Sequence, residues 1–460
     1  MTRAHTWLAQ READLVTDLQ GLLRIPSLEA AAEPGAPFGP ENRRALDYMI
    51  ALSERAGMRT TDMDGYCGFA EFGSGEKMVM TLGHVDVVPV GPGWKHEPFG
   101  AEIDGDYVYS RGASDDKGPT MAMFYAAWAI HAVAGDLGVR VRSMFGCNEE
   151  SGFKCIEHYV AHEEAPTYGV APDADWPCIH GEKGIATFLV RRPLPQGEVT
   201  LLELEGGQRP NIVIDACRGR VRVAASHRAI MEAKVAEAWD ANLSFAWHGD
   251  ELEIHARGKA AHGSTPFAGD SALVRLLRFL MESAPVSQED EYYRLFEIGH
   301  PGGNGLGIAG ADQPSGPLTC NLGIVGVTDG QLEITVNVRY PVTFVGDEVR
   351  AKAEAKLAQL GHGYHLDQWD DSPPLYFPID HPLVAAITEA YQAETGESRT
   401  PRTMGGGTYA RAVPNCVAIG TGWEGDGPAH ETDERFKIAH LHRAARIYVR
   451  ILLGLIEKAR

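Results

Sequence analysis

Cysteine is scarce and unpaired in this sequence: its seven cysteines are scattered and form no Cys-x-x-Cys motif. This odd, widely spaced set excludes a disulfide framework and predicts a reduced, cytoplasmic protein. The first residues lack the apolar core of a signal peptide. The charge-free stretch Gly118–Gly135 reaches the lower limit of a membrane-spanning length. Pro119 and many alanines make a buried helix the better interpretation, so we expect no membrane association.

Positive charge is also in short supply. The chain carries 42 lysines and arginines against 63 aspartates and glutamates, a formal net charge of −21. Nucleic acids and anionic membrane surfaces both require a basic face, so the sequence predicts neither partner. The hydrophobic content of 44% and charged content of 23% are typical of globular proteins. A length of 460 residues predicts two or three domains with a large core.

Short apolar runs, separated by helical segments, mark both ends of the chain. A first helix is predicted from about Ala4 to Arg24, where leucines recur at helical spacing. The apolar runs are Met78–Leu82, Val139–Phe145, Tyr168–Ala171 and Asn415–Ile419. Alternating strands and helices predict an α/β fold with a mainly parallel sheet and helices on both faces.

The middle of the chain has a different pattern. Strand-like runs at Ala186–Val190, Leu252–Ala256 and Leu332–Val338 are interrupted by helices at about Ala272–Glu282 and Asp347–Leu360. This pattern predicts an α+β domain of two similar halves inserted into the first domain. We therefore expect a discontinuous catalytic domain, residues 1–184 and 374–460, and an inserted domain, residues 185–373.

Histidines and carboxylates follow the apolar runs. In open α/β sheets, ligands bind at the carboxyl ends of the strands, so these side chains are expected in one cleft. They are His84, Glu149, Glu150, Asp173 and His430. A His/Asp/Glu set without cysteine favours zinc, manganese or cobalt.

Two short pairs have a more specific interpretation. In His84-x-Asp86, the carboxylate can hold the imidazole nitrogen that does not bind metal. In Glu149-Glu150, one carboxylate can bind metal while its neighbour accepts a proton. Either pair alone is common on protein surfaces, so the argument depends on their occurring together.

Several motifs, in the same order along nearly the whole chain, resemble the metallopeptidase family of carboxypeptidase G, the ArgE/DapE deacylases, aminoacylases and carnosinases. They are Leu82–Pro89, Gly112–Gly118, Asn148–Gly152, Pro172–Pro177 and Pro428–Glu434. Two further segments, Gly181–Gly184 and Met404–Arg411, resemble the PepV-type bacterial dipeptidases more closely.

The resemblance implies a zinc-peptidase-like catalytic domain with two divalent metal ions per chain, expected to be zinc, with manganese or cobalt as alternatives. His84 and Asp173 would hold one ion, Glu150 and His430 the other, and Asp115 would bridge them. The peptide bond after Asp115 would be cis.

Catalytic and substrate-binding roles follow from the same resemblance. Glu149 would act as the general base on a metal-bridging water, and Asp86 would support the centre. The inserted domain would be a lid whose His262 donates to the developing oxyanion. The substrate would be bound by Asn211, Arg339, Gly406, Gly407 and Thr408, with Arg339 on its C-terminal carboxylate.

The implied function is a metal-dependent dipeptidase whose partner is a small-molecule dipeptide. An N-acyl-amino-acid amidohydrolase (a deacylase) with the same di-metal centre remains an alternative. A third hypothesis is a catalytically silent binding protein on the same fold. Such a protein would lack a metal ligand or the general base, whereas this sequence has a suitable residue at every expected position. The resemblance also implies a monomer, because the second half of a long lid occupies the place of a partner subunit.

Overall fold

The computed structural model describes residues 1–460, which form two compact units. Unit 1 comprises 1–180, 377–402 and 407–460, and unit 2 comprises 181–376 and 403–406. These bounds differ from the predicted ones, most clearly at 403–406. That segment belongs to unit 2 because Met404 O accepts a hydrogen bond from Lys183 N at 2.9 Å. Gly405 O likewise accepts one from Arg339 Nη1 at 3.0 Å.

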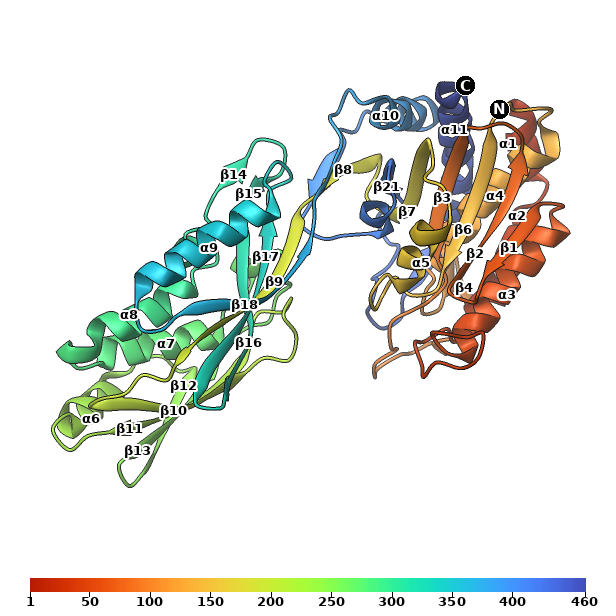
Figure 1. Cartoon of the computed structure of the whole chain (residues 1–460). Coiled ribbons are helices and arrows are strands. Elements are labelled where there is room, and N and C mark those ends of the chain that lie inside the picture. Colours follow the sequence, from red (N-terminus) through yellow and green to blue (C-terminus); the bar gives the residue numbers. More distant parts are fainter. The chain divides into compact units, whose positions relative to one another are not determined.

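The central strands of unit 1 belong to a nine-stranded sheet (Figure 1). Its order is β1 (Arg59–Met63), β2 (Cys67–Gly73), β6 (Arg140–Gly146), β3 (Met78–His84), β7 (Tyr168–Ala174), β21 (Cys416–Gly420), β8 (Cys178–Glu182) and β19 (Leu375–Tyr376), with β20 (Arg402–Met404) paired to β8. The neighbouring strands β6, β3, β7 and β21 pair with one another in parallel. The outer pairs are antiparallel, so the sheet is mixed rather than mainly parallel. One reason is a tight Asp64-Gly65 turn between β1 and β2, which only an antiparallel pair can use.

Helices cover both faces of this sheet, as predicted (Figure 1). They are α1 (Thr2–Ala9), α2 (Glu12–Leu23), α3 (Pro40–Arg55), α4 (Lys117–Val133), α5 (Lys154–His162), α10 (Pro382–Thr395) and α11 (Ile438–Ala459). The helices α4 and α11 pack on each other and on β3, whereas α3 and α5 pack on β2. Most of the charge-free stretch lies in α4, where all residues from Gly118 to Ala127 are buried. No helix has both the length and the apolar character needed to cross a membrane.

The predicted first helix is two helices. The chain leaves the helical conformation at Arg11, which has φ −128° and ψ 18°. The Arg11 guanidinium lies 4.1 Å from the centre of the Trp7 ring, a cation–π contact that favours the break. Leu8 and Leu15 are both buried, so the apolar periodicity continues across a turn that carries no glycine or proline signal.

A small sheet beside the large one positions two loops of the site. Its order is β22 (Arg435–Lys437), β5 (Tyr107–Tyr109) and β4 (Glu102–Asp104), all antiparallel. The strand β5 leads into the loop before α4, and β22 follows the loop that carries His430. The β5–β22 ladder therefore brings together segments more than 300 residues apart.

Unit 2 contains an antiparallel eight-stranded sheet with helices packed on it. Its order is β12 (Leu243–His248), β13 (Glu251–Arg257), β11 (Ala216–Val223), β10 (Val199–Gly206), β16 (Thr319–Thr328), β17 (Gln331–Tyr340), β9 (Gly184–Pro193) and β18 (His365–Ser372). Its helices are α6 (Arg228–Glu237), α7 (Ala272–Ser283), α8 (Glu289–Ile298) and α9 (Gly346–Leu360). The remaining elements are the two-stranded sheet of β14 (Ala311–Asp312) and β15 (Gly316–Pro317) and short 3₁₀ turns.

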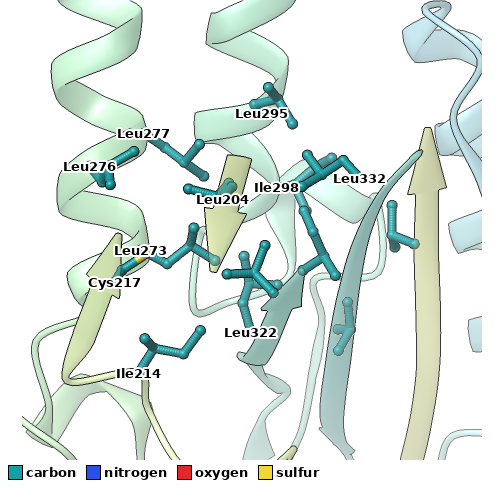
Figure 2. Close-up of a cluster of buried hydrophobic side chains, with 14 of the residues drawn as sticks. Leu204, Ile214, Cys217, Leu273, Leu276, Leu277, Leu295, Ile298, Leu322 and Leu332 are labelled. Atoms are coloured by element: carbon teal, nitrogen blue, oxygen red, sulfur yellow. The ribbon is translucent and has the colours of Figure 1, made fainter. Parts of the chain in front are cut away.

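Alternating burial along β9, β11 and β13 shows why one face of this sheet packs and the other faces solvent. The packed face and the helices above it form one apolar core, which includes Leu204, Leu273 and Leu322 (Figure 2). The two halves of the sheet join where β10 pairs with β16, with Gly206 opposite Val325.

Candidate metal centre

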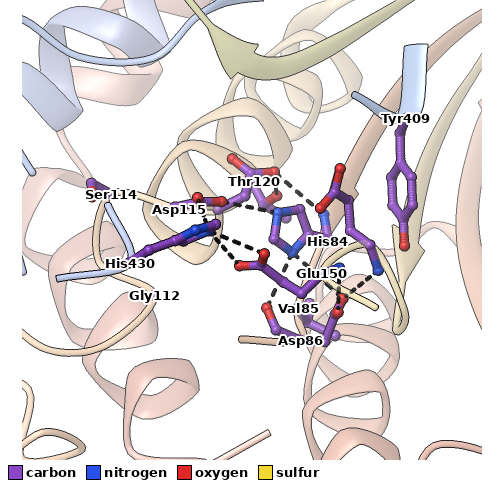
Figure 3. Close-up of polar contacts among 12 residues, drawn as sticks. His84, Val85, Asp86, Gly112, Ser114, Asp115, Thr120, Glu150, Tyr409 and His430 are labelled. Atoms are coloured by element: carbon purple, nitrogen blue, oxygen red, sulfur yellow. Dashed lines mark hydrogen bonds and ion pairs between the residues drawn. The ribbon is translucent and has the colours of Figure 1, made fainter. Parts of the chain in front are cut away.

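His84 stands at the carboxyl end of β3 and is buried. The preceding residue must be glycine, because a Cβ at Gly83 would lie 1.9 Å from Thr120 Oγ1 of α4. His84 Nε2 lies 3.1 Å from Asp115 Oδ1, and Nδ1 lies 3.1 Å from the backbone oxygen of Asp86 (Figure 3). The close packing of strand on helix thus fixes an imidazole whose Nε2 points at a carboxylate.

Asp115 lies between two histidines that are far apart in sequence. Its Oδ1 faces His84 Nε2, and its Oδ2 lies 3.0 Å from His430 Nε2 (Figure 3). Both carboxylate oxygens of Glu150 lie 3.1 Å from the same His430 nitrogen. One ligand atom each from His84, Asp115 and Glu150 fall within 4.8 Å of one another, a spacing that can hold a metal ion. The peptide bond between Asp115 and Asp116 is cis, as expected.

The carboxylate of Asp86 orients the Glu149–Glu150 loop. Its Oδ1 accepts a hydrogen bond from Glu149 N at 3.1 Å, and its Oδ2 accepts one from Glu150 N at 3.0 Å. Asp86 Oδ1 is 3.5 Å from His84 Nδ1, farther than the backbone oxygen that faces the same nitrogen. The backbone oxygen of Asp86 is thus the nearer acceptor for this nitrogen, and the carboxylate lies within ion-pair distance of it as well. That the carboxylate holds His84 stays a prediction, and the same side chain also holds the glutamates.

Crowded carboxylates dominate the electrostatics. Burial, together with Glu150, Asp115 and Asp86, raises the pKa of Glu149 to about 8. Burial and the charges of Asp115, Asp116 and Glu149 also raise the pKa of Asp173, which stands near the end of β7.

The pKa values of the two histidines are raised as well, which for an imidazole favours the charged form. Hydrogen bonds to Asp115 and then Glu150 raise the pKa of His430 to about 10. Burial opposes ionisation of Asp115, but hydrogen bonds from His430 and His84 outweigh it and lower the pKa of Asp115. In the metal-free protein, the imidazoles of His84 and His430 therefore favour their charged forms opposite these acids.

The donor set suits divalent metal ions. Asp115 and Glu150 form ion pairs only with histidines, and neither Glu149 nor Asp173 has a lysine or arginine within ion-pair distance. A cation that replaced the protons would relieve the like-charge repulsion that raises the pKa of Glu149 and Asp173. Unit 1 thus brings together all the predicted acids and imidazoles of the centre: His84, Asp86, Asp115, Glu149, Glu150, Asp173 and His430.

Sequence reasoning missed the role of Tyr409. Its ring lies edge-on to His84, with 5.9 Å between centroids, and its hydroxyl accepts a hydrogen bond from Asn148 N at 3.3 Å. The same hydroxyl lies 2.8 Å from Cys155 Sγ. A Cβ at Gly146 would lie 2.5 Å from the Tyr409 hydroxyl, so a glycine at the end of β6 makes room for it. The available signal was the Met404–Arg411 motif, which contains this tyrosine.

Sequence reasoning noted a glutamate after His430 in the segment Pro428–Glu434 but gave Glu434 no role. It is fully buried, and its carboxylate accepts five hydrogen bonds from the segment Arg111–Asp115. The signal was a glutamate four residues after a candidate metal ligand.

The predicted residues of the inserted domain form a second cluster, within unit 2. Asn211 O accepts a hydrogen bond from Gly263 N at 2.7 Å, and Ile212 forms a β-bridge with His262. Burial and the nearby positive charge of Arg339 lower the pKa of His262. Arg339 is itself buried, and its guanidinium donates to Gly405 O beside Gly406.

Not all predicted binding residues belong to that cluster. Gly407 and Thr408 lie in unit 1, beyond the break at Gly406. Thr408 caps the short turn Tyr409–Ala412, and its Oγ1 accepts from Ala410 N at 3.2 Å. The motif that the sequence presents as continuous is therefore divided between the two units.

The fold and site define an α/β protein with histidines and carboxylates clustered at the carboxyl ends of parallel strands, an arrangement suited to divalent metal ions. Residues 80–454 match the model of peptidase family M20/M25/M40, and the chain belongs to this family. The resemblance drawn from the motifs is thereby confirmed.

Relatives extend over the whole chain. A Bacillus subtilis (strain 168) protein named "Putative dipeptidase YtjP" is 35% identical over 97% of this chain and 98% of its own length. A Staphylococcus haemolyticus (strain JCSC1435) protein named "Putative dipeptidase SH1171" is 33% identical over 96% of this chain and 97% of its own length.

Solved structures share the fold. Human carnosine dipeptidase 1 has a TM-score of 0.55 and 16% identity, covering 99% of this chain and 98% of its own. Aminoacylhistidine dipeptidase from Vibrio alginolyticus has a TM-score of 0.58 and 13% identity, covering 97% of this chain and 96% of its own. At these identities, the likeness concerns the fold alone.

Proposed function

We propose that this protein is a metal-dependent dipeptidase. The observation that carries the proposal is Asp115, whose two oxygens face His84 and His430 separately, as a bridging ligand between two ions would. Membership of the M20/M25/M40 family and relatives named dipeptidases over the full chain length support the choice of substrate.

Two divalent ions, expected to be zinc, would be held by His84 and Asp173 on one side and by Glu150 and His430 on the other. When bound, they would polarise the scissile carbonyl and stabilise negative charge on its oxygen. Manganese and cobalt accept the same nitrogen and oxygen donors, so the metal is a variable in the experiment below.

Glu149 is assigned as the general base. Its carboxylate takes one proton from the attacking water as the bond between the water oxygen and the carbonyl carbon forms. It then delivers that proton to the nitrogen of the leaving amine as the C–N bond breaks. The Asp86 carboxylate keeps Glu149 in position by accepting a hydrogen bond from the backbone N–H of Glu149.

Substrate recognition is assigned to the cluster of unit 2. His262 donates to the carbonyl oxygen as negative charge develops there, and Asn211 donates to the same oxygen. Arg339 binds the C-terminal carboxylate, which suits a planar guanidinium with two parallel donors. Gly406, Gly407 and Thr408 add backbone and hydroxyl donors to that carboxylate. These assignments make unit 2 a lid in function.

A substrate panel tests the proposal. The enzyme is first stripped of metal with a chelator and then supplied with zinc, manganese or cobalt in turn. Hydrolysis of dipeptides, tripeptides and N-acyl amino acids is measured with each metal. Metal-restored cleavage confined to dipeptides is the expected result. Cleavage of acyl amino acids alone would overturn the dipeptidase assignment in favour of a deacylase. No cleavage with any metal would favour a silent binding protein.

A further inference from the structure

Glu434 is a buried carboxylate surrounded by donors. Its Oε1 accepts from Ser114 N at 2.8 Å, from Ser114 Oγ at 3.0 Å and from Asp115 N at 3.1 Å. Its Oε2 accepts from Arg111 Nη1 at 2.7 Å and from Gly112 N at 3.1 Å. None of its side chain is exposed, and the Arg111 guanidinium that pairs with it is 1% exposed.

The chain path explains why this glutamate reaches that loop. Strand β22 pairs with β5 so that Arg435 lies opposite Tyr109. One step beyond the ladder, Ser110 N donates to the backbone oxygen of Glu434 at 3.0 Å. The loop that contains His430 therefore runs beside the loop that contains Asp115, and the Glu434 side chain crosses from one loop to the other.

We propose that Glu434 is a positioning residue of the metal centre, which holds the loop of Asp115 in register with the loop of His430. The inference rests on the proposed metal site but concerns a residue that binds no metal itself. Its hydrogen bond from Asp115 N acts on the backbone of the bridging ligand. Four residues earlier, His430 Nε2 meets Asp115 Oδ2 at 3.0 Å.

Only a carboxylate satisfies these neighbours, because all five hydrogen bonds come from donors. A glutamine at position 434 would turn its NH₂ group toward either Arg111 and Gly112 or Ser114 and Asp115. In both orientations, buried donors lose their acceptor, and an unsatisfied buried donor is costly. Side chains that hold metal ligands in this way typically contribute about 10- to 100-fold to metal affinity.

The other flank of the loop is held separately. Asp433 Oδ1 accepts from Lys95 N at 2.9 Å and from His96 N at 3.2 Å. Loss of the Glu434 contacts therefore leaves one anchor of the loop in place, so a folded variant with displaced ligands is expected.

Glu434→Gln tests the inference, with Glu71→Gln as the matched control. Glu71 is also a buried glutamate with arginine partners, Arg59 at 3.0 Å and Arg142 at 2.9 Å, but it lies in β2 outside the site loops. Chelated proteins are titrated with zinc or manganese by calorimetry, bound metal is counted by elemental analysis, and folding is checked by circular dichroism. We expect Glu434→Gln to weaken metal binding about 10- to 100-fold. Glu71→Gln should lose stability but keep its metal affinity.

Further readouts separate positioning from a purely structural role. At saturating metal, the kcat of Glu434→Gln should recover towards the wild-type value, because the ligands themselves are intact. Ser114→Ala, which removes one of the five donors, should weaken metal binding less and in the same direction. A folded Glu434→Gln with wild-type metal affinity would overturn the inference.

If Glu434→Gln fails to fold, Ser114→Ala decides, and unchanged affinity there would refute the inference. Because metal binding is measured without substrate, a failure of the dipeptidase assignment would leave this result intact.

Discussion

At the residue scale, Glu149 shows how position gives a common side chain its chemistry. Its backbone N–H is held by Asp86, and burial with neighbouring acids raises its pKa to about 8. A carboxyl group with a pKa near the working pH is both an effective acceptor and an effective donor of protons. Glu150, one residue later, instead presents both oxygens to His430.

Glu149→Gln should lower kcat by at least about 10²-fold, because the amide cannot accept the proton of the attacking water. Metal content should stay at the wild-type level, since the assigned ligands are unchanged. Exposed Glu157 of α5 offers a control, and Glu157→Gln should leave both quantities unaltered. Steady-state kinetics and elemental analysis measure the two effects. Near-wild-type activity in Glu149→Gln would refute the general-base assignment.

His84, Glu150, Asp173 and His430 could be predicted as candidate ligands because each follows an apolar run, and parallel strands end at a shared edge. The ligand role of Asp115 came from the family resemblance instead. Asp86 was recognised as a supporting residue, but its hydrogen bonds from the backbone of Glu149 and Glu150 were not, because they depend on loop geometry. The contacts of Glu434 and Tyr409 were not predicted for a related reason. Their partners, Asp115 and Asn148, lie 319 and 261 residues away in the chain.

At the scale of elements, the contact between β3 and α4 is what fixes His84. Gly83→Ala would place a methyl group against Thr120 Oγ1 of α4, so strand and helix would have to separate. Overpacking of this kind typically costs about 1–3 kcal/mol. We expect denaturant unfolding to show a loss of that size and metal affinity to fall with it, because His84 is the next residue.

A second glycine provides the comparison. A Cβ at Gly454, within α11, would meet no atom within 4 Å. Gly454→Ala should therefore be neutral or stabilise by up to about 1 kcal/mol through helix propensity. Equal destabilisation of both variants would show that the close packing at Gly83 has no special role.

Element types were predictable where periodicity was strong, as in the helix Ala272–Ser283 and the strand Gln331–Tyr340. The break at Arg11 was not, because the apolar face continues across it and no glycine or proline marks it. The share of parallel strand pairs in the large sheet was overestimated for another reason. Apolar runs indicate burial, but strand direction depends on connections, and short turns such as Asp64-Gly65 reverse the chain.

At the scale of the whole molecule, the sheet of unit 2 consists of two four-stranded halves that join where β10 pairs with β16. The resemblance to long-lid dipeptidases implies that the second half takes the place of a partner subunit. We therefore expect a monomer, and light scattering at low micromolar concentration should give a mass near 49.9 kDa. A two-protomer mass would contradict this expectation.

The charge of the centre also predicts how the whole metal-free protein responds to pH. The pKa of Glu149 is raised from 4.5 to about 8, and that of His430 from 6.5 to about 10. The folded state therefore binds these protons more tightly than the unfolded chain does. The stability that they contribute is fully present below the unfolded pKa and is lost as pH rises through the folded pKa. The lowered pKa of Asp115 makes stability change with pH in the opposite direction, but this contribution is lost only as pH falls below 3.8.

Chelated protein should therefore melt at progressively lower temperature between pH 5 and pH 9, as Glu149 and then His430 lose their protons. Added metal binds the deprotonated ligands, so the rise in melting temperature that it produces should grow over the same range. Glu149→Gln removes one of the titrating groups, so the melting temperature of the metal-free variant should fall less steeply as pH rises. Scanning calorimetry at matched ionic strength measures all three trends. A melting temperature independent of pH after confirmed metal removal would mean that these acids are not coupled to the stability of the fold.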